Sequence, residues 1–278
     1  MYCLLGGAVR DRLRAYTHAF GEAPAQLAAQ GKELVARGWN ALKVGTFVAG
    51  WFGGTLERRW PDQVVARVGA LREAVGPDVD ILFDCHGRLT PTQAVMLARE
   101  LEPFKLFWYE EPVPPEGPED LPWVASKVNI PLATGERSYL KSGFRGILER
   151  GGVAYLQPDV CHAGGILEVY QIGAMAAAYS VLMAPHNPLG PVATAACIQL
   201  TAALPNFAIQ EVWQDTDVPV PWRDALVKHN IEIKDGFFQL PTRPGLGVEI
   251  DWEVAAAHPG IAKDLPRVYL EDGTVADW

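Results

Sequence analysis

Short apolar runs that favour β-strands recur along this chain, separated by stretches long enough for a helix. Most of the runs are continuously apolar rather than alternating, which is typical of parallel strands covered on both faces. Eight runs can be recognised: LRAYTH (13–18), NALKVG (40–45), DILFD (80–84), LFWYE (106–110), PLATG (131–135), VAYLQPD (153–159), VLMAPH (181–186) and FAIQE (207–211). The recurrence therefore predicts a parallel sheet with helical crossovers.

Helical patterns with clear ends lie between these runs. Residues 61–75 carry apolar side chains on one face and stop at Gly76 and Pro77, whereas Thr90 and Pro91 supply an N-cap and a first-turn proline for the next helix. Further helices are expected over residues 24–37, 138–150, 164–179 and 190–203. The alternation predicts a TIM-like (β/α)7β barrel, because right-handed crossovers between eight parallel strands close the sheet on itself. A doubly wound open sheet is the structural alternative.

The repeat ends near residue 211. Beyond it the sequence contains DVPVPW, DGFFQLP and PGLGVEID, which are typical of turns and short extended pieces. We therefore expect residues 1–211 to form the barrel that carries the active site. Residues 212–278 are expected to form a C-terminal segment that packs on the barrel.

The charge and the cysteines exclude several classes of protein. A net charge of −9 without clustered Lys and Arg argues against a nucleic-acid surface. The longest mostly apolar stretch, IGAMAAAYSVLMAP, is shorter than the ~20 residues that span a bilayer, so no membrane segment is expected. The cysteines form no C-x-x-C pair, which suits reduced thiols with structural roles in a cytoplasmic protein.

Polar residues fall at the C-terminal ends of six predicted strands. They are Asp84, Glu110, Glu136, Asp159, His186 and Glu211. The steps between them are 26, 26, 23, 27 and 25 residues, so each step corresponds to one strand and one helix. Because the strand ends of a (β/α) barrel share one mouth, we expect these side chains to converge on one pocket.

Three of these carboxylates, Asp84, Glu110 and Glu136, would repel one another in a common pocket. A divalent cation would remove that repulsion, and an all-oxygen set of ligands favours Mg²⁺, or Mn²⁺, over zinc. Each of the three could instead be a helix N-cap or part of a surface ion pair. Their equal spacing favours the metal site.

The sequence also suggests a general base. His186 lies one predicted strand beyond Asp159, and a carboxylate on the neighbouring strand can accept an imidazole N–H and raise the basicity of the other ring nitrogen. A core histidine bonded to a backbone carbonyl is the alternative.

Two further strand ends could face a substrate. Glu211, if its anionic neighbours keep it protonated, could donate a hydrogen bond to a developing enolate, although a strand-end salt bridge explains it almost as well. Lys43 could meet a substrate carboxylate, or it could extend along the barrel wall as an ordinary lysine. His162 precedes a helix, and it could be a cap, a more remote partner of the site or a direct participant. The other histidines have no supporting constellation: His18, His229 and His258.

Motifs of several other enzyme classes are absent from the sequence. There is no G-x-G-x-x-G after a strand, no G-x-x-x-x-G-K-[ST], no H-E-x-x-H and no G-x-S-x-G. The sequence therefore lacks the motifs expected for dinucleotide-binding, P-loop, zinc-protease and serine-hydrolase functions.

Six motifs together carry a family resemblance: FDCHGR (83–88), WYEEPVPPE (108–116), ATGERSY (133–139), LQPDVCHAGGI (156–166), APHNPLGPVATAA (184–196) and AIQEV (208–212). They resemble the barrel domain of the enolase superfamily, in the mandelate racemase subgroup and most closely among the D-galactonate dehydratase-like acid-sugar dehydratases. The resemblance runs from YCLLGGAVRDR to PGLGVEIDWE, which is essentially the whole chain.

The resemblance implies a Mg²⁺-dependent lyase that dehydrates a small anionic sugar acid, D-galactonate or a related aldonate, to a 2-keto-3-deoxy acid. In the family pattern the metal ligands are Asp84, Glu110 and Glu136. The metal and Lys43 hold the substrate carboxylate and the metal carries the charge of the enediolate. Arg88 is a further candidate for contacting the anionic substrate.

The same pattern divides the acid and base roles. It makes His186 the base, oriented by Asp159, and it has Glu211 stabilise the enediolate. His86 is then the acid that protonates the departing C3 hydroxyl. Because residues two apart on a strand point the same way, Asp84 and His86 are both expected to face the barrel mouth.

Two departures from the family pattern bear on the reaction. Racemases of the subgroup carry K-x-K on the second strand, whereas this chain has Lys43, Val44 and Gly45. The missing second base disfavours racemisation, which with cycloisomerisation remains the alternative activity. Family members also carry an N-terminal cap that closes the site, and the sequence begins where that cap would end.

We therefore expect a fragment, a misassigned start or a barrel that works without a lid. A catalytically silent, metal-binding barrel is a third alternative. Part of the selectivity for substrate stereochemistry is expected from the aromatic loop TFVAGWFGG (46–54). Assembly into a homo-oligomer is implied by the resemblance alone.

Overall fold

The computed structural model describes residues 1–45, 60–117, 119–213, 222–260, 268–269 and 275–276. Two compact units can be distinguished. Unit 1 comprises Met1–His18, Thr134–Glu149 and Ala154–Gly260, and unit 2 comprises Ala19–Ala133, Arg150–Val153 and Ile261–Trp278. The aromatic loop at 46–54 and most of DVPVPW (217–222) lie outside the described residues. The division expected at residue 211 stays a prediction.

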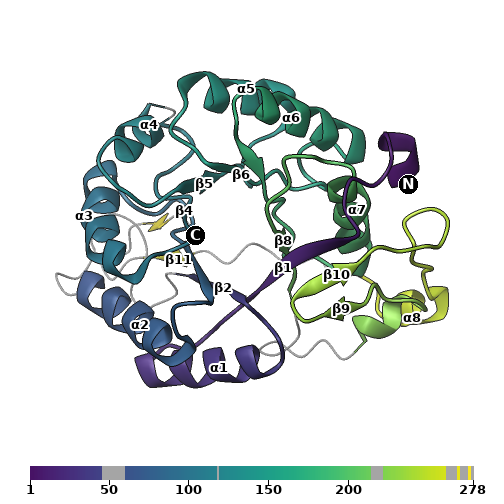
Figure 1. The fold of residues 1–278 in the computed structure, drawn as a ribbon, viewed down its shortest axis with the longest axis horizontal. Helices are drawn as coiled ribbons and strands as arrows, with labels where there is room; N and C mark the ends of the chain where they lie inside the picture. The colour runs from purple at the N-terminus through teal and green to yellow at the C-terminus, as the bar shows by residue number, and fades with distance from the viewer. Residues whose placement is uncertain (46–59, 118, 214–221, 261–267, 270–274, 277–278) are drawn as a thin grey trace. The chain divides into compact units, whose positions relative to one another are not determined.

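Unit 2 is built around parallel strands in chain order: β2 (Ala41–Gly45), β3 (Asp80–Asp84), β4 (Trp108–Glu110) and the first residues of β5 (Leu132–Thr134). Its helices are α1 (Pro24–Ala36), α2 (Trp60–Val75), α3 (Pro91–Leu101), the 3-10 helix η2 (Glu102–Phe104) and α4 (Asp120–Ala125). Figure 1 shows α2 and α3 as a layer beside these strands. A two-stranded antiparallel ladder joins β11 (Val268–Tyr269) to β12 (Val275–Ala276).

The strands of unit 2 are buried on both faces. The consecutive residues Ile81, Leu82 and Phe83 of β3 are all 0% exposed. Since neighbouring residues of a strand point to opposite faces, both faces must be covered. The interpretation of the continuously apolar runs as parallel, fully buried strands is confirmed.

The start of α3 follows from its sequence. Thr90 Oγ1 accepts the N–H of Gln93 at 3.4 Å, and Gln93 Oε1 accepts the N–H of Thr90 at 3.0 Å. Pro91 occupies the first turn, where its missing N–H costs no hydrogen bond. The predicted helix start is confirmed, and α2 likewise ends just before Gly76, which has a φ of 79°.

Unit 1 pairs the first strand of the chain with the eighth. β1 (Arg12–His18) runs parallel to β8 (Gln210–Glu211), while β6 (Tyr155–Leu156) runs parallel to β7 (Leu182–Met183). A parallel bridge between Met183 and Phe207 joins β7 to the segment before β8. A (β/α) barrel requires the first and eighth strands to pair, whereas a doubly wound sheet keeps them apart.

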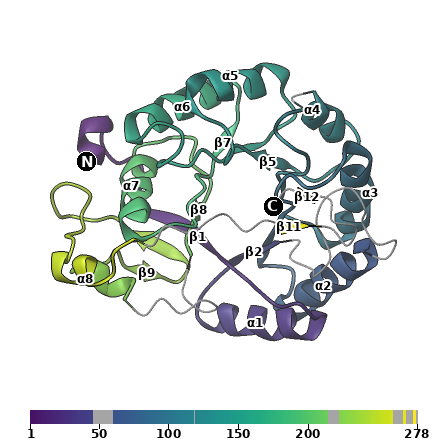
Figure 2. The same ribbon diagram turned by 180° about the vertical axis from the view of Figure 1, so that it is seen from behind.

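The helices of unit 1 occupy the predicted ranges to within two residues at each end. They are α5 (Leu140–Arg150), α6 (Ile166–Ala178) and α7 (Pro191–Ala202), preceded by the N-terminal 3-10 helix η1 (Tyr2–Leu5). Figure 2 shows α7 beside β1 and β8. Arg10 ties the chain before β1 to this region by donating to the carbonyls of Thr201 and Leu204, each at 2.6 Å.

The end of unit 1 forms a hairpin that the sequence only partly predicted. β9 (Ile233–Lys234) and β10 (Phe237–Gln239) are antiparallel, and the connecting Asp235 and Gly236 have φ of 51° and 75°. Two positive φ angles in a two-residue Asp-Gly loop match the twist of a hairpin. β10 then pairs antiparallel with Arg12–Arg14 of β1, a contact that the sequence did not predict.

Shorter elements complete the segment after β8. They are η3 (Asp224–Leu226) and α8 (Trp252–Ala257), and Asp251 caps α8 by accepting the N–H groups of Glu253 and Val254. Among the described helices, none has both the length and the apolar character needed to cross a bilayer.

Candidate active site

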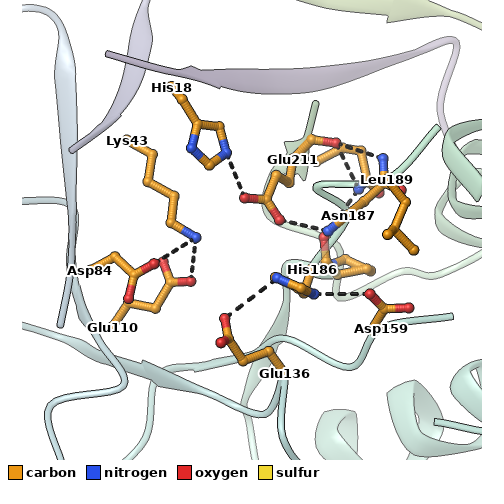
Figure 3. Close-up of polar contacts among 12 residues, drawn as sticks. His18, Lys43, Asp84, Glu110, Glu136, Asp159, His186, Asn187, Leu189 and Glu211 are labelled. Carbon is orange, nitrogen blue, oxygen red and sulfur yellow. Dashed lines mark hydrogen bonds and ion pairs between the residues drawn. The ribbon is translucent and has the colours of Figure 1, made fainter. Parts of the chain in front are cut away.

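Two predicted metal ligands lie side by side in unit 2. The strand register pairs Asp84 at the end of β3 with Glu110 at the end of β4, and both residues are 0% exposed. Lys43 lies two residues before the partner of Asp84 on β2, so its side chain is on the same face of the sheet. Its Nζ lies 3.0 Å from Asp84 Oδ2 and 2.6 Å from Glu110 Oε1 (Figure 3).

This cluster is held in its charged form. Glu110 Oε2 accepts the indole N–H of Trp108 at 2.8 Å, and Asp84 Oδ1 accepts the backbone N–H of His86 at 2.8 Å. Burial alone would raise the pKa of Asp84, but the charges of His86 and Lys43 and the hydrogen bonds from the His86 backbone and from Lys43 lower it to about 2. Asp84 is therefore a carboxylate at neutral pH.

The side chain of His86 lies near Asp84 because of a turn, and not because of the strand alternation that was predicted. β3 ends at Asp84, and His86 has a left-handed backbone with a φ of 52°, so the strand alternation that was expected to aim its side chain does not extend to it. The backbone hydrogen bond to Asp84 Oδ1 makes a tight turn instead. The turn leaves His86 Nε2 3.2 Å from Asp84 Oδ2, and Arg88 follows in the same turn, partly exposed.

The predicted base and its partner lie together in unit 1. His186 Nδ1 is 2.9 Å from Asp159 Oδ2, and Asp159 Oδ1 accepts the N–H of Cys161 at 2.7 Å. Burial would raise the pKa of Asp159, but the hydrogen bonds from His186 and Cys161 and the histidine charges outweigh it and lower that pKa. An ionised Asp159 favours the His186 tautomer that carries its hydrogen on Nδ1.

The other ring nitrogen of His186 faces Glu136, the third predicted metal ligand. His186 Nε2 lies 3.5 Å from Glu136 Oε2, and the Glu136 side chain is only 10% exposed. Glu136 follows directly after β5 and Gly135, whose φ is 135°. A Cβ on Gly135 would lie 2.8 Å from the Phe144 ring and 3.1 Å from the backbone of Gln157, so only glycine allows this close approach.

Glu211 is the best anchored carboxylate of unit 1. It is 0% exposed, and its Oε2 accepts the backbone N–H of Asn187 at 2.6 Å. The side chain of Asn187 donates to the Glu211 carbonyl at 3.2 Å and to Thr194 Oγ1 at 2.9 Å. The second carboxylate oxygen of Glu211, Oε1, lies 2.8 Å from His18 Nε2 (Figure 3).

The sequence prediction for His18 was wrong. It gave this residue no supporting constellation, whereas the structure places its ring against Glu211. The signal that could have identified it is its position, because His18 ends the first strand just as the other proposed residues end theirs. Asn187 was also missed, although it directly follows His186. His162 is half exposed, and its Nδ1 is 3.9 Å from Asp159 Oδ2.

We assign no role in these clusters to the cysteine thiols or to His258. All four cysteines are free: Cys3 and Cys161 are exposed, whereas Cys85 and Cys197 are buried. Burial raises the pKa of both the Cys85 and the Cys197 thiol well above the ordinary value for cysteine. Because the thiolate is the nucleophilic form, neither thiol is activated as a nucleophile. His258 stacks on Trp222 with ring centroids 4.6 Å apart.

The two clusters offer different chemistry. Unit 1 supplies an imidazole oriented by a carboxylate, which is the arrangement of a general base. Unit 2 supplies two buried carboxylates that share one ammonium group, and their oxygens are ligands of the kind that a hard divalent cation prefers. The donor set therefore fits Mg²⁺ better than zinc.

Comparison with known proteins gives consistent matches. Residues 26–254 match the family described as enolase C-terminal domain-like. A D-galactonate dehydratase from Cronobacter sakazakii is 39% identical over 282 residues, which cover 99% of this chain and 73% of that protein.

Two solved structures share the fold. A mandelate racemase/muconate lactonizing enzyme from Sulfitobacter sp. is 38% identical with a TM-score of 0.87, covering 95% of this chain and 68% of that one. A member of the enolase superfamily from Salmonella Typhimurium is 35% identical with a TM-score of 0.86, covering 93% and 70%. Because the likeness extends over nearly the whole chain, the predicted barrel fold is confirmed.

Proposed function

Since this chain belongs to the enolase superfamily, with the C-terminal barrel domain of mandelate racemase and muconate lactonizing enzymes, we propose that it dehydrates a sugar acid with the help of Mg²⁺. The substrate would be D-galactonate or a related aldonate and the product a 2-keto-3-deoxy acid. The D-galactonate dehydratase among its relatives supports this substrate class. The observation that carries the proposal is the contact between His186 and Asp159, since a C2 proton is removed only by a well-oriented base.

The base acts through one ring nitrogen. In neutral His186 the hydrogen on Nδ1 is donated to ionised Asp159, which leaves the lone pair of Nε2 to accept the C2 proton of the substrate. When Nε2 takes that proton, the negative charge of Asp159 stabilises the imidazolium that forms. The electron pair of the broken C–H bond passes to the enediolate.

The acidic residues fit the metal that the family implies. We assign Asp84 and Glu110 of unit 2 as its ligands, together with Glu136, as in the family pattern. In unit 2, two buried carboxylates face a single ammonium group, and a divalent cation would compensate the excess negative charge. When bound, Mg²⁺ would polarise the substrate carboxylate and stabilise the charge that develops on it.

The other residues complete the elimination. We assign to His86 the proton that passes to the C3 hydroxyl, so that this group leaves as water while the C2–C3 double bond forms. Lys43 and Arg88 are assigned to the anionic carboxylate of the substrate, and Glu211 to the enediolate oxygen opposite the base. The resulting enol becomes the 2-keto acid by taking up a proton at C3.

A panel of aldonic acids tests the proposal. The protein is incubated with Mg²⁺ and each aldonate, beginning with D-galactonate, and the 2-keto-3-deoxy product is measured. We expect His186→Asn to abolish product formation, whereas His258→Asn, an exposed histidine of the same unit, keeps it. EDTA should stop the reaction and added Mg²⁺ should restore it.

Two other outcomes would decide for the alternatives. Exchange of the C2 hydrogen with deuterium from the solvent, without loss of water, would indicate racemase-like chemistry on the same fold. If no aldonate undergoes either exchange or dehydration, the proposal is wrong, and the alternative of a silent metal-binding barrel remains.

A further inference from the structure

His18 contacts Glu211 because the first and eighth strands are paired. The parallel register sets Tyr16 opposite Glu211, and the N–H of Val212 donates to the Tyr16 carbonyl at 3.1 Å. His18 therefore stands two residues beyond the pairing partner of Glu211, at the same end of the two strands. From there its Nε2 reaches Glu211 Oε1 at 2.8 Å.

The two oxygens of Glu211 each face one nitrogen. Oε2 accepts the backbone N–H of Asn187 at 2.6 Å, and Oε1 faces His18 Nε2. A neutral imidazole that carries its hydrogen on Nε2 donates that hydrogen to Oε1 in this contact. Two N–H donors then fix the plane of a carboxylate that is itself 0% exposed.

The imidazole of His18 is itself held in place. The Trp213 ring packs against it with centroids 4.7 Å apart at an interplanar angle of 51°, and Tyr16 lies on the same strand with a centroid distance of 6.4 Å. The His18 side chain keeps 12% of its surface exposed. A ring fixed between an aromatic neighbour and a buried carboxylate has little freedom to turn away from Glu211.

We propose that His18 is a positioning residue of the active site, which donates Nε2–H to Glu211 and holds that carboxylate in one orientation toward the substrate. The inference rests on the proposed dehydratase function, because it assigns a task to Glu211 in that reaction. Neither the sequence motifs nor the family pattern quoted above includes His18.

Two substitutions of His18 distinguish the effect of its hydrogen bond from the effect of its size. His18→Leu removes the donor, and His18→Gln keeps an N–H donor at similar reach. Since a hydrogen bond to a charged group contributes about 1.5–3 kcal/mol, we expect His18→Leu to lower kcat about tenfold to a hundredfold, with KM changed by less than about threefold. We expect His18→Gln to recover most of kcat, and His258→Leu to leave both constants unchanged.

A spectroscopic measurement tests the contact without any substrate. In ¹⁵N spectra of histidine-labelled protein, we expect the His18 signal to show a hydrogen on Nε2, and we expect that signal to shift in Glu211→Gln. Circular dichroism and thermal melting establish that each variant is folded. Only folded variants enter the kinetic comparison.

The outcomes distinguish this inference from the proposed function. If the wild-type protein dehydrates no aldonate, the proposed function fails, while the ¹⁵N spectrum still reports on the contact between His18 and Glu211. If the wild-type protein is active and folded His18→Leu has an unchanged kcat, the positioning role is wrong. Equal losses in His18→Leu and His18→Gln would also overturn it, because the hydrogen bond would then not be what matters.

Discussion

Lys43 Nζ lies 2.6 Å from Glu110 Oε1, within a cluster where both side chains are almost completely buried. The same ammonium group is 3.0 Å from Asp84 Oδ2, so one cation balances two anions that could not otherwise share this space. The contact gives Lys43 a structural role in addition to the substrate contact proposed for it.

Lys43→Met tests the structural role. Methionine keeps the length of the chain but removes the charge, so two buried carboxylates face each other without a partner. We expect the free energy of unfolding in EDTA to fall by about 3–5 kcal/mol, the usual cost of breaking a buried ion pair. Urea unfolding measures it, and added Mg²⁺ should restore part of the loss.

The control for that measurement is Lys228→Met. Lys228 pairs with Glu249 at 3.2 Å, but both side chains are about half exposed, so the loss should be much smaller than in Lys43→Met. Similar losses in the two variants would contradict the role of Lys43.

Asp159→Asn should impair the base. The amide cannot stabilise the imidazolium of His186, so we expect kcat to fall by about 10² or more. An imidazole without a neighbouring carboxylate binds its proton less tightly, so the acidic limb of the kcat/KM profile should move to lower pH. An unchanged profile would show that His186 does not depend on Asp159 for its basicity.

Asp159 also makes stability depend on pH in a definite direction. Its pKa in the folded protein is lowered, so its contribution is complete above the ordinary aspartate pKa of about 3.9 and is lost as pH falls through the folded value. Urea unfolding of wild-type protein and Asp159→Asn should therefore differ most near neutral pH and converge in acid.

His86→Asn should separate the acid from the metal site. Asparagine tolerates the left-handed backbone at this position, and its backbone N–H can still donate to Asp84. We expect Mg²⁺ affinity, measured by calorimetry, to stay within about threefold, while dehydration falls by about 10² or more. A large loss of Mg²⁺ affinity would instead make His86 part of the metal site, and His162→Asn serves as the control.

The repeating part of the structure could be predicted from the sequence. Each of the eight apolar runs overlaps one observed strand, because parallel strands buried on both faces need continuous apolar residues. The helix ends were equally readable, since caps such as Thr90 act within one turn of the chain. The proposed carboxylates and His186 could be found from the sequence because they follow the C-terminal ends of predicted strands.

Contacts between segments far apart in the sequence could not be predicted from such local patterns. The approach of His18 to Glu211 depends on strand pairing across 193 residues, and nothing local to either residue encodes it. The turn that aims His86 depends on one side chain to backbone hydrogen bond, which replaced the expected strand geometry. The pairing of β10 with β1 likewise joins residues that only the folded chain brings together.

β1 changes partner halfway along its length. Arg12–Arg14 pair with β10, whereas Ala15 and Tyr16 pair with β8. During synthesis β1 leaves the ribosome some two hundred residues before either of its partners. Loop-closure entropy must be overcome before such distant pairings form, which slows folding. The nascent chain must therefore keep an unpaired strand edge of unit 1 from aggregating until both partner strands have been translated.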